Sequence, residues 1–386
     1  MAAGRLQPRA GEPRVTEADL PAPCVQSHAA NLMTLGDGAL GCVWFSGSQE
    51  GVADISVWFS RLAPGSSTWS APVQLSDDAT RSEQNPILFA APDGRLWLLH
   101  TAQRAGNQDT AVVRCRVSSD HGASWGPSRE LFAQAGIFVR QPVVVLDDGA
   151  WLLPIFHCPT RPGEKWAGHE DHSAVMVSRD QGNSWTEVAV PGSTGCVHMN
   201  IVKGRRPGEL LAFFRSRWAD HVHRSVSADN GRTWSVPSPT VVPNNNSSIQ
   251  VTRLASGALA MVCNPSSAAD ATERRASLYD EIDDGDGRVE ARPRGRSAFW
   301  GAPRAPMSVL LSHDDGLSWP QRRDLETGDG YCMTNDSRQR LNREYSYPSI
   351  HQGTDGAIHV AYTVFRQKIR HLRFDEAWVR EADVSR

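Results

Sequence analysis

The stretch Ser227-Ala-Asp-Asn-Gly-Arg-Thr-Trp234 recurs along the chain and decides the fold. Its aspartate can accept hydrogen bonds from turn amides, its glycine permits a positive φ, and its hydroxyl residue can tie two strands together. The tryptophan then buries a large ring between neighbouring sheets. We call this pattern the turn motif. Full copies are Ser118-Ser-Asp-His-Gly-Ala-Ser-Trp125, Ser178-Arg-Asp-Gln-Gly-Asn-Ser-Trp185 and Ser312-His-Asp-Asp-Gly-Leu-Ser-Trp319, and a degenerate copy at residues 60–69 ends in Trp69.

A second turn signal alternates with the turn motif. It is a glycine turn, usually Asp-Gly, between two apolar runs, which is a strong short-range signal for a β-hairpin. Six such hairpins define six units, and no segment shows the 3.6-residue period of a long helix. This internal repeat predicts an all-β fold, a six-bladed β-propeller. The hairpin turns lie at residues 35–38, 91–94, 146–149, 206–208, 255–257 and 353–356.

The repeats also predict the limits of the domain. We expect one propeller over residues 24–378, with an N-terminal extension at 1–23 and a C-terminal tail at 379–386. Residues near the N-terminus should supply a strand to the last blade and so close the ring. The longest gap between turn motifs separates the fourth and fifth units, which indicates a loop insertion at 266–303.

Composition excludes several classes of partner. The chain of 386 residues is 40% hydrophobic and 22% charged, which is typical of a soluble globular protein. A formal net charge of −3 provides no basic field for nucleic acid or for an anionic membrane. No apolar run reaches the length of a membrane span, and residues 1–23 contain no apolar core of a signal peptide. We therefore expect a cytoplasmic protein.

The cysteines and histidines give no strong metal signal. Seven cysteines, odd in number and never spaced as CxxC, favour free thiols over a disulfide framework or a zinc site. The stretch His169-Glu-Asp-His172 has the spacing of metal ligands, but no helix is expected there to orient both rings. The sequence predicts neither a metal nor another cofactor.

One end of the propeller should carry the chemistry. In an antiparallel four-stranded blade, the start of the innermost strand and the loop between the second and third strands lie at the same end. A lone loop arginine is usually a solvated charge, but Arg215 ends an apolar strand, where burial demands a partner. His198 and Tyr345 fit a packed core position equally well. The residues expected at this end are His28, Asp54, Arg140, His198, Arg215, Arg304 and Tyr345.

The turn motifs resemble the Asp boxes of the sialidase superfamily, and the resemblance covers about residues 26–374. It implies a propeller in which three arginines bind a sugar carboxylate, a tyrosine paired with a glutamate is the nucleophile, and an aspartate is the general acid. Arg215 matches the second arginine and Arg304 the third. Tyr345, in Glu344-Tyr-Ser-Tyr-Pro, matches the nucleophile, and Asp54 lies where the acid is expected. His28 replaces the first arginine and His198 replaces the glutamate.

The resemblance implies an exo-glycosidase that hydrolyses a terminal acidic sugar, sialic acid or a relative, from a glycan. Two converging guanidiniums favour a carboxylate, and a neutral histidine can accept the proton of a tyrosine nucleophile. A lyase of the rhamnosyl-glucuronate type and a non-catalytic glycan-binding propeller remain alternatives. The sugar, the linkage and the oligomeric state stay open. The predicted catalytic residues are Asp54, His198 and Tyr345, and the predicted substrate-binding residues are His28, Arg140, Arg215 and Arg304.

Overall fold

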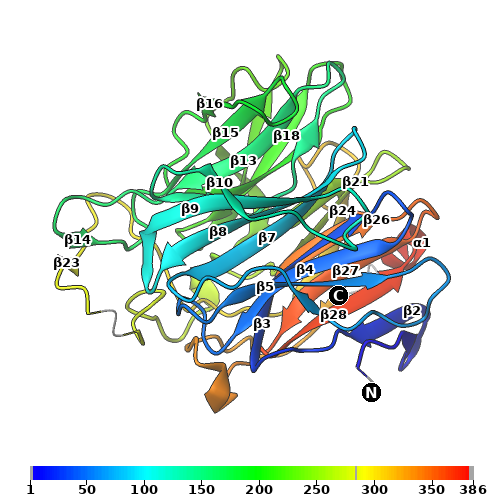
Figure 1. The fold of residues 1–386 in the computed structure, drawn as a ribbon, viewed down its shortest axis with the longest axis horizontal. Helices are drawn as coiled ribbons and strands as arrows, with labels where there is room; N and C mark the ends of the chain where they lie inside the picture. The colour runs from blue at the N-terminus through cyan, green and yellow to red at the C-terminus, as the bar shows by residue number, and fades with distance from the viewer. Residues whose placement is uncertain (1–2, 283–284, 382–386) are drawn as a thin grey trace.

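The computed structural model describes residues 3–282 and 285–381. In this part of the chain the strands form the six-bladed β-propeller that the repeats predicted (Figure 1). Within each blade the strands are antiparallel, and in blades 1 to 5 they follow the chain from the axis to the rim.

The blades follow one another in sequence order. Blade 1 is β3 (Gln26–Thr34), β4 (Leu40–Gly47), β5 (Ser56–Leu62) and β6 (Val73–Gln74), and blade 2 is β7 (Ser82–Ala90), β8 (Leu96–Arg104), β9 (Asn107–Ser118) and β10 (Arg129–Phe132). Blade 3 has a divided inner strand, β11 (Ile137–Val139) and β12 (Val144–Val145), followed by β13 (Trp151–His157), β15 (His172–Ser178) and β16 (Thr186–Ala189). Blade 4 is β17 (Cys196–Lys203), β18 (Leu210–Ser216), β19 (His221–Ser227) and β20 (Ser238–Pro243), and blade 5 is β21 (Gln250–Arg253), β22 (Leu259–Cys263), β24 (Met307–Ser312) and β25 (Gln321–Glu326).

The last blade is completed by the N-terminal residues, as expected. It contains β26 (Tyr345–Gln352), β27 (Ile358–Val364) and β28 (Lys368–Phe374), and β2 (Glu12–Asp19) pairs antiparallel with β28. A further strand, β1 (Gln7–Arg9), continues the sheet outside β2. Asp19 forms ion pairs with Lys368 at 2.5 Å and with Arg370 at 2.8 Å across this junction. The strands within residues 1–23 are therefore part of blade 6.

The turn motif is a closed hydrogen-bond network. In the copy at 227–234, the Asp229 carboxylate accepts hydrogen bonds from the backbone amide of Thr233 at 2.9 Å and from its hydroxyl at 2.6 Å. The Ser227 hydroxyl accepts from the amide of Gly231 and donates to Asp229. Asn230 and Gly231 both have positive φ, 61° and 79°. The same bonds form in the other three full copies.

The tryptophans of these turns are buried to different extents. Trp69, Trp234 and Trp319 are buried, as expected. Trp125 and Trp185 are only half-buried and pack at the edge of the clusters between blades, against Phe59 and Phe132. The expectation that all five rings are fully buried holds for three of them.

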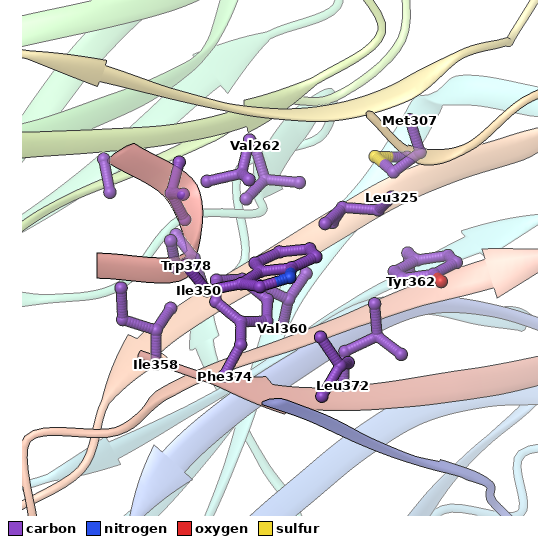
Figure 2. Packing of buried hydrophobic residues seen from close by; sticks show 14 of the residues in the cluster. Val262, Met307, Leu325, Ile350, Ile358, Val360, Tyr362, Leu372, Phe374 and Trp378 are labelled. Carbon is purple, nitrogen blue, oxygen red and sulfur yellow. The ribbon is translucent and has the colours of Figure 1, made fainter. Parts of the chain in front are cut away.

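Apolar clusters fill the spaces between neighbouring blades. Among the described residues, each pair of adjacent blades shares one such cluster. The cluster between blades 5 and 6 includes Val262, Met307 and Tyr362, and it also takes in Trp378 from the helix α1 (Glu376–Arg380) (Figure 2). Side-chain packing thus holds the blades together, and single backbone hydrogen bonds between neighbouring blades, such as that from the amide of Glu83 to the carbonyl of Ile55, add to it.

The innermost strands are interrupted near the axis. The pairing register shifts in β3, β7, β17 and β26, and residues close to these shifts have positive φ values of 49° to 61°. A β-bulge of this kind turns a side chain away from the regular alternation of a strand. The bulged positions with positive φ are Ala29, Asn85, His198 and Tyr347, and Asn246 just before β21 shares this conformation.

Two long loops lie over one end of the propeller. The loop between β13 and β15 contains β14 (Glu164–Lys165), and the insertion between β22 and β24 contains β23 (Val289–Glu290) and the 3-10 helix η1 (Ala268–Asp270). The strands β14 and β23 pair in parallel, so the loops of blades 3 and 5 join each other at one side of the molecule (Figure 1). A second 3-10 helix, η2 (Ser337–Gln339), precedes β26.

All seven cysteines are free thiols. No helix in the described ranges has the length and apolar character needed to cross a membrane.

Candidate active site

The ring of Tyr347 lies at the centre of a buried cationic cluster. The guanidinium carbons of Arg140 and Arg215 are each 5.5 Å from the ring centroid, and that of Arg304 is at 5.7 Å. The imidazoles of His28 and His198 lie with their centroids 4.3 Å and 5.7 Å away. The structure therefore brings together five of the seven residues that the sequence placed at this end.

Tyr345 does not join this cluster. Its ring packs against Tyr362 and Phe365 in the apolar layer between blades 5 and 6, and burial raises the pKa of its hydroxyl. A regular strand would put residues 345 and 347 on the same face. The register shift between Ser346 and Ser349 and the φ of 51° at Tyr347 break that alternation, so Tyr347 faces the axis instead.

Arg215 connects the tyrosine to a histidine. Its Nη1 donates a hydrogen bond to the Tyr347 hydroxyl at 2.5 Å and lies 3.4 Å from Nε2 of His198. Its Nε donates to Oδ1 of Asn246 at 2.8 Å. Its Nη2 is buried and has no hydrogen-bond partner among the described residues. Burial lowers the pKa of Arg215 to about 10, so the group is still a cation at neutral pH.

Arg140 is bound to the backbone of the innermost strands. Its nitrogens donate to the carbonyl oxygens of Ala29, Ala30, Tyr347 and Pro348 at 3.1 to 3.3 Å. Burial lowers its pKa to about 10. Arg140 thus links the innermost strands of blades 1 and 6 through their carbonyl groups, and its guanidinium also lies close to the Tyr347 ring.

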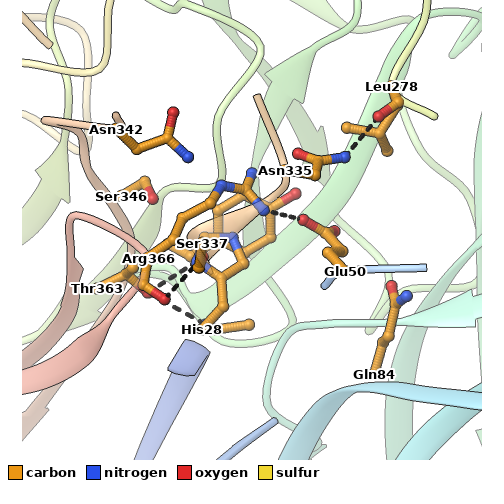
Figure 3. Close-up of polar contacts among 12 residues, drawn as sticks. His28, Glu50, Gln84, Leu278, Asn335, Ser337, Asn342, Ser346, Thr363 and Arg366 are labelled. Carbon is orange, nitrogen blue, oxygen red and sulfur yellow. Dashed lines mark hydrogen bonds and ion pairs between the residues drawn. The ribbon is translucent and has the colours of Figure 1, made fainter. Parts of the chain in front are cut away.

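Arg304 belongs to a chain of four buried charges. Its Nη1 donates to Glu344 at 3.1 Å, Glu344 also pairs with Nε of Arg366 at 2.7 Å, and Arg366 pairs in turn with Glu50 (Figure 3). Burial alone would raise the pKa of Glu344, but the two arginines outweigh it and hold that pKa below its ordinary value. The carboxylates and guanidiniums of this chain compensate one another.

The two histidines are held in the neutral form. Nδ1 of His28 is 2.8 Å from the Thr363 hydroxyl, while its Nε2 is buried without a partner in the described structure. Nδ1 of His198 is 3.0 Å from the Ser248 hydroxyl. Burial, and after it the neighbouring arginines, lowers the pKa of both imidazoles well below the ordinary value. A neutral imidazole can accept a proton.

Asp54 lies apart from the buried cluster. Its side chain is exposed on the loop between β4 and β5, where one carboxylate oxygen accepts a hydrogen bond from the amide of Ser48 at 3.2 Å. Glu50, on the same loop, is the carboxylate that enters the cluster.

In the stretch His169-Glu-Asp-His172, the aspartate is the residue that pairs with a buried arginine. Asp171 is buried, accepts hydrogen bonds from Nε of Arg217 at 2.8 Å and from the Trp166 indole at 2.9 Å, and neutralises that arginine. His169 and His172 bond to backbone groups instead. No group of metal-ligating side chains was found within residues 3–282 and 285–381.

Sequence reasoning missed the residues that compensate the arginines. Glu50, Glu344 and Arg366 are buried ionic residues, and two of their ion pairs, Glu50–Arg366 and Glu344–Arg304, join different blades. No local sequence pattern predicts such pairs. The signal available for Glu344 was its position immediately before a buried inner strand. Around the axis, the buried guanidiniums of Arg140, Arg215, Arg217, Arg304 and Arg366 outnumber the buried carboxylates of Glu50, Asp171 and Glu344.

Comparisons with known proteins give one family match and several similar structures. Residues 38–360 match the family described as BNR repeat-like domain. A protein of unknown function from Dyadobacter fermentans superposes with a TM-score of 0.68 at 13% identity, covering 94% of this chain and 99% of that chain. The NanB sialidase of Streptococcus pneumoniae superposes with a TM-score of 0.64 at 11% identity, covering 94% and 70%. The corresponding values for the leech intramolecular trans-sialidase are 0.62, 13%, 92% and 69%.

The search of curated proteins found no match to the sequence. These superpositions show a shared sialidase-like propeller fold. Because the identities are only 11 to 13%, any shared chemistry has to be argued from the side chains.

Proposed function

The chain belongs to the BNR repeat-like domain family, and from the arrangement of its axis we propose that it is an exo-glycosidase acting on a terminal acidic sugar of a glycan. The substrate would be a sialic acid or a related 2-keto acid. One observation carries the proposal: Arg215 contacts the Tyr347 hydroxyl and His198 while its Nη2 has no protein partner in the described residues. A buried guanidinium nitrogen without a partner is costly, and a substrate carboxylate would satisfy it.

The charge balance supports an anionic substrate. Arg304 is compensated by Glu344 and Arg217 by Asp171, whereas Arg215 and Arg140 bond only to neutral groups. Nε2 of His28, which has no partner among the described residues, offers a further contact, and its ring centroid lies 4.3 Å from that of Tyr347. We assign the substrate carboxylate first to Arg215. Arg304, near the same Tyr347 ring, is assigned as the second arginine by the family resemblance, with His28 in the place of the missing arginine.

The assigned reaction proceeds through a covalent intermediate. His198 takes the phenolic proton of Tyr347, whose oxygen then attacks the anomeric carbon while Asp54 protonates the departing glycan oxygen. In the second step Asp54 removes a proton from water, the water oxygen attacks the anomeric carbon, and the tyrosine leaves and regains its proton from His198. Arg215 stabilises negative charge on the tyrosine oxygen because its Nη1 already donates to it. Tyr347 takes this role because Tyr345 faces away.

A lyase is the second candidate, and the two neutral histidines beside Tyr347 favour it. On a uronate, His198 would remove the proton next to the carboxylate, the new carbon–carbon double bond would expel the linked glycan oxygen, and Tyr347 would protonate that oxygen. No covalent adduct forms on this route.

The test compares Arg215→Ala and Arg215→Lys with Arg343→Ala, an exposed arginine. Aryl glycosides of a sialic acid and of a neutral sugar serve as substrates. We expect Arg215→Ala to weaken transition-state binding of the acidic glycoside by roughly 2–5 kcal/mol, with little rescue by lysine, which cannot rebuild a bidentate contact.

Mass spectrometry of the product separates the candidates. A free acidic sugar supports hydrolysis, and an unsaturated uronate supports elimination. Equal turnover of the neutral glycoside would exclude the carboxylate assignment. Saturable glycan binding without any product would indicate that the protein binds glycans and does not cleave them.

A further inference from the structure

The buried cluster is covered by the insertion of blade 5. His28 and Arg215 are 0% and 1% exposed, so no substrate can reach them in this conformation. The amide of Phe299 donates to the carbonyl of Arg217, and the carbonyl of Phe299 accepts from Nδ2 of Asn246, each at 2.8 Å. Since Asn246 also binds Nε of Arg215, the insertion is bonded to a residue that orients the central arginine.

A second part of the insertion sends a tyrosine into the propeller. The Tyr279 hydroxyl accepts hydrogen bonds from Nε2 of Gln108 at 3.0 Å and of Gln103 at 3.2 Å. Both glutamines are buried, on β9 and β8 of blade 2, and Oε1 of Gln103 has no partner in the part of the chain described. The preceding residue, Leu278, is held through its carbonyl by Nδ2 of Asn335 at 2.6 Å (Figure 3).

The opposite wall is shaped to receive this ring. Gly51 lies on the loop that carries Glu50, and a Cβ atom at residue 51 would stand 2.6 Å from Cε1 of Tyr279. The φ of 98° at Gly51 also suits glycine. The Tyr279 ring thus fills a recess between blades 1 and 2, with the glutamine amides at its inner end and the Glu50–Arg366 pair nearby.

Uncharged amides in a buried recess are suited to sugar hydroxyls, because each amide offers both a donor and an acceptor. The recess now holds a phenolic hydroxyl, and one amide oxygen in it still lacks a donor. Tyr279 also lines a pocket of about 180 Å³, together with Trp166, Ser277 and Asp280 among others. Tyr279 therefore borders this outer pocket while its hydroxyl bonds to the glutamines of the recess.

We propose that Tyr279 is a displaceable plug whose hydroxyl stands in for a sugar hydroxyl, and that Gln103 and Gln108 recognise a hydroxyl of the substrate once Tyr279 has left. This inference rests on the proposed function for the identity of the sugar, but not for the existence of the plug. The glutamines determine specificity for the ring hydroxyls, while Arg215 and Arg304 bind the carboxylate. Substrate reaches the cluster through the outer pocket when residues 275–282 lift.

Hydrogen–deuterium exchange of the full chain tests the plug directly. Tyr279→Phe removes only the hydroxyl, and Tyr331→Phe is the matched control, since Tyr331 lies against Arg343 outside the recess. Loss of the bonds to the glutamines should speed exchange of residues 275–282 roughly 10-fold. The control should match the wild type. Equal exchange in the wild type and Tyr279→Phe would overturn the plug.

Titration with free N-acetylneuraminic acid and with glucuronic acid tests displacement. The sugar that binds should speed exchange of residues 275–282 in the wild type, and it should bind up to about 10-fold tighter to Tyr279→Phe, where no hydroxyl competes for the amides. Slower exchange of 275–282 on binding, together with weaker binding to Tyr279→Phe, would make Tyr279 a substrate contact and overturn the proposal. Faster exchange in Tyr279→Phe with no binding of either sugar would support the plug while contradicting the proposed substrate.

Discussion

Tyr347 combines a hydroxyl bonded to a guanidinium with a ring that faces two further guanidiniums. Cations over an aromatic face are held by its quadrupole, so the ring itself helps to keep the arginines in place. Replacing the hydroxyl and replacing the ring should therefore have different consequences. In the proposed mechanism the hydroxyl takes part in the reaction, while the ring helps to hold the arginines at the axis.

The two tyrosines of this strand provide a matched pair of variants. Tyr347→Phe should reduce kcat by at least 10³-fold, because it removes the assigned nucleophile and keeps the ring. Tyr345→Phe should leave kcat within about threefold of the wild type, because its hydroxyl lies between blades. Single-turnover assays on an aryl sialoside measure both. The opposite result would return the role to Tyr345, as the family resemblance first implied.

The pH profile should reflect the neutral state of His198. In the proposed mechanism His198 acts in its unprotonated form, and its lowered pKa extends that form to lower pH. We expect the acid limb of kcat/KM to lie below pH 6.5. The folded protein should also lose stability below pH 6.5. Histidines in the unfolded chain bind protons there, whereas the buried imidazoles, with their lowered pKa, stay neutral, so acid favours the unfolded state.

Circular dichroism at each pH separates unfolding from the loss of catalysis. An acid limb centred at or above pH 6.5 in protein that is still folded would contradict the assignment of His198 as the base.

At the scale of the element, the turn motif shows how one sequence pattern gives different burial. Trp234 packs against Leu210 and Ala212 between blades 3 and 4, whereas Trp125 holds the same place in its motif but stays half-exposed. The motif fixes the turn through its own hydrogen bonds. The depth at which its tryptophan is buried depends on the neighbouring blade.

Replacing each of these two tryptophans with alanine should show how much its packing, as distinct from the turn itself, contributes to stability. Trp234→Ala should lower the free energy of unfolding by about 3–5 kcal/mol through the cavity it leaves, and Trp125→Ala by less. Urea denaturation measures both values. Because these turns lie at the opposite end from the cationic cluster, substrate affinity of the folded variants should match the wild type. A loss of affinity at unchanged stability would contradict this placement.

The inner strands explain which site residues the sequence could predict. Topology alone placed His28, His198, Arg215 and Arg304 at one end, because strand starts and the loops between second and third strands must meet there. It could not choose Tyr347, because a bulge is a local departure from the two-residue period. The partners Glu50 and Arg366 come from different blades, and only packing brings them together.

At the scale of the molecule, the repeats were sufficient to predict six blades and a closing strand. The closure runs through the pairing of β2 with β28, and Asp19 contributes ion pairs with both Lys368 and Arg370. Burial alone would raise the pKa of Asp19, but the two cations outweigh it and hold that pKa below its ordinary value. The junction is thus partly electrostatic.

Asp19→Asn tests the strength of this closure. It should lower the free energy of unfolding by about 1–3 kcal/mol, because two partly buried cations lose a charged acceptor. Asp329→Asn is the control, since the Asp329–Arg343 pair is exposed and should contribute less than about 1 kcal/mol. Thermal and urea unfolding give both values. Equal effects of the two variants would show that the closing strand is held by its backbone and apolar contacts alone.

The pairing of β2 with β28 also determines when the propeller can close during synthesis. Asp19 and Arg370 are 351 residues apart, so the ribosome needs roughly 20 to 70 s at ~5–20 residues per second to deliver the partner of β2. Throughout that time β2 is an unpaired edge, the kind of segment that pairs with other chains. Blades 1 to 5 can form while the nascent chain is still attached. The ring itself closes only after β28 of blade 6 has emerged, so until then β2 can pair either with its own chain or with a neighbouring one.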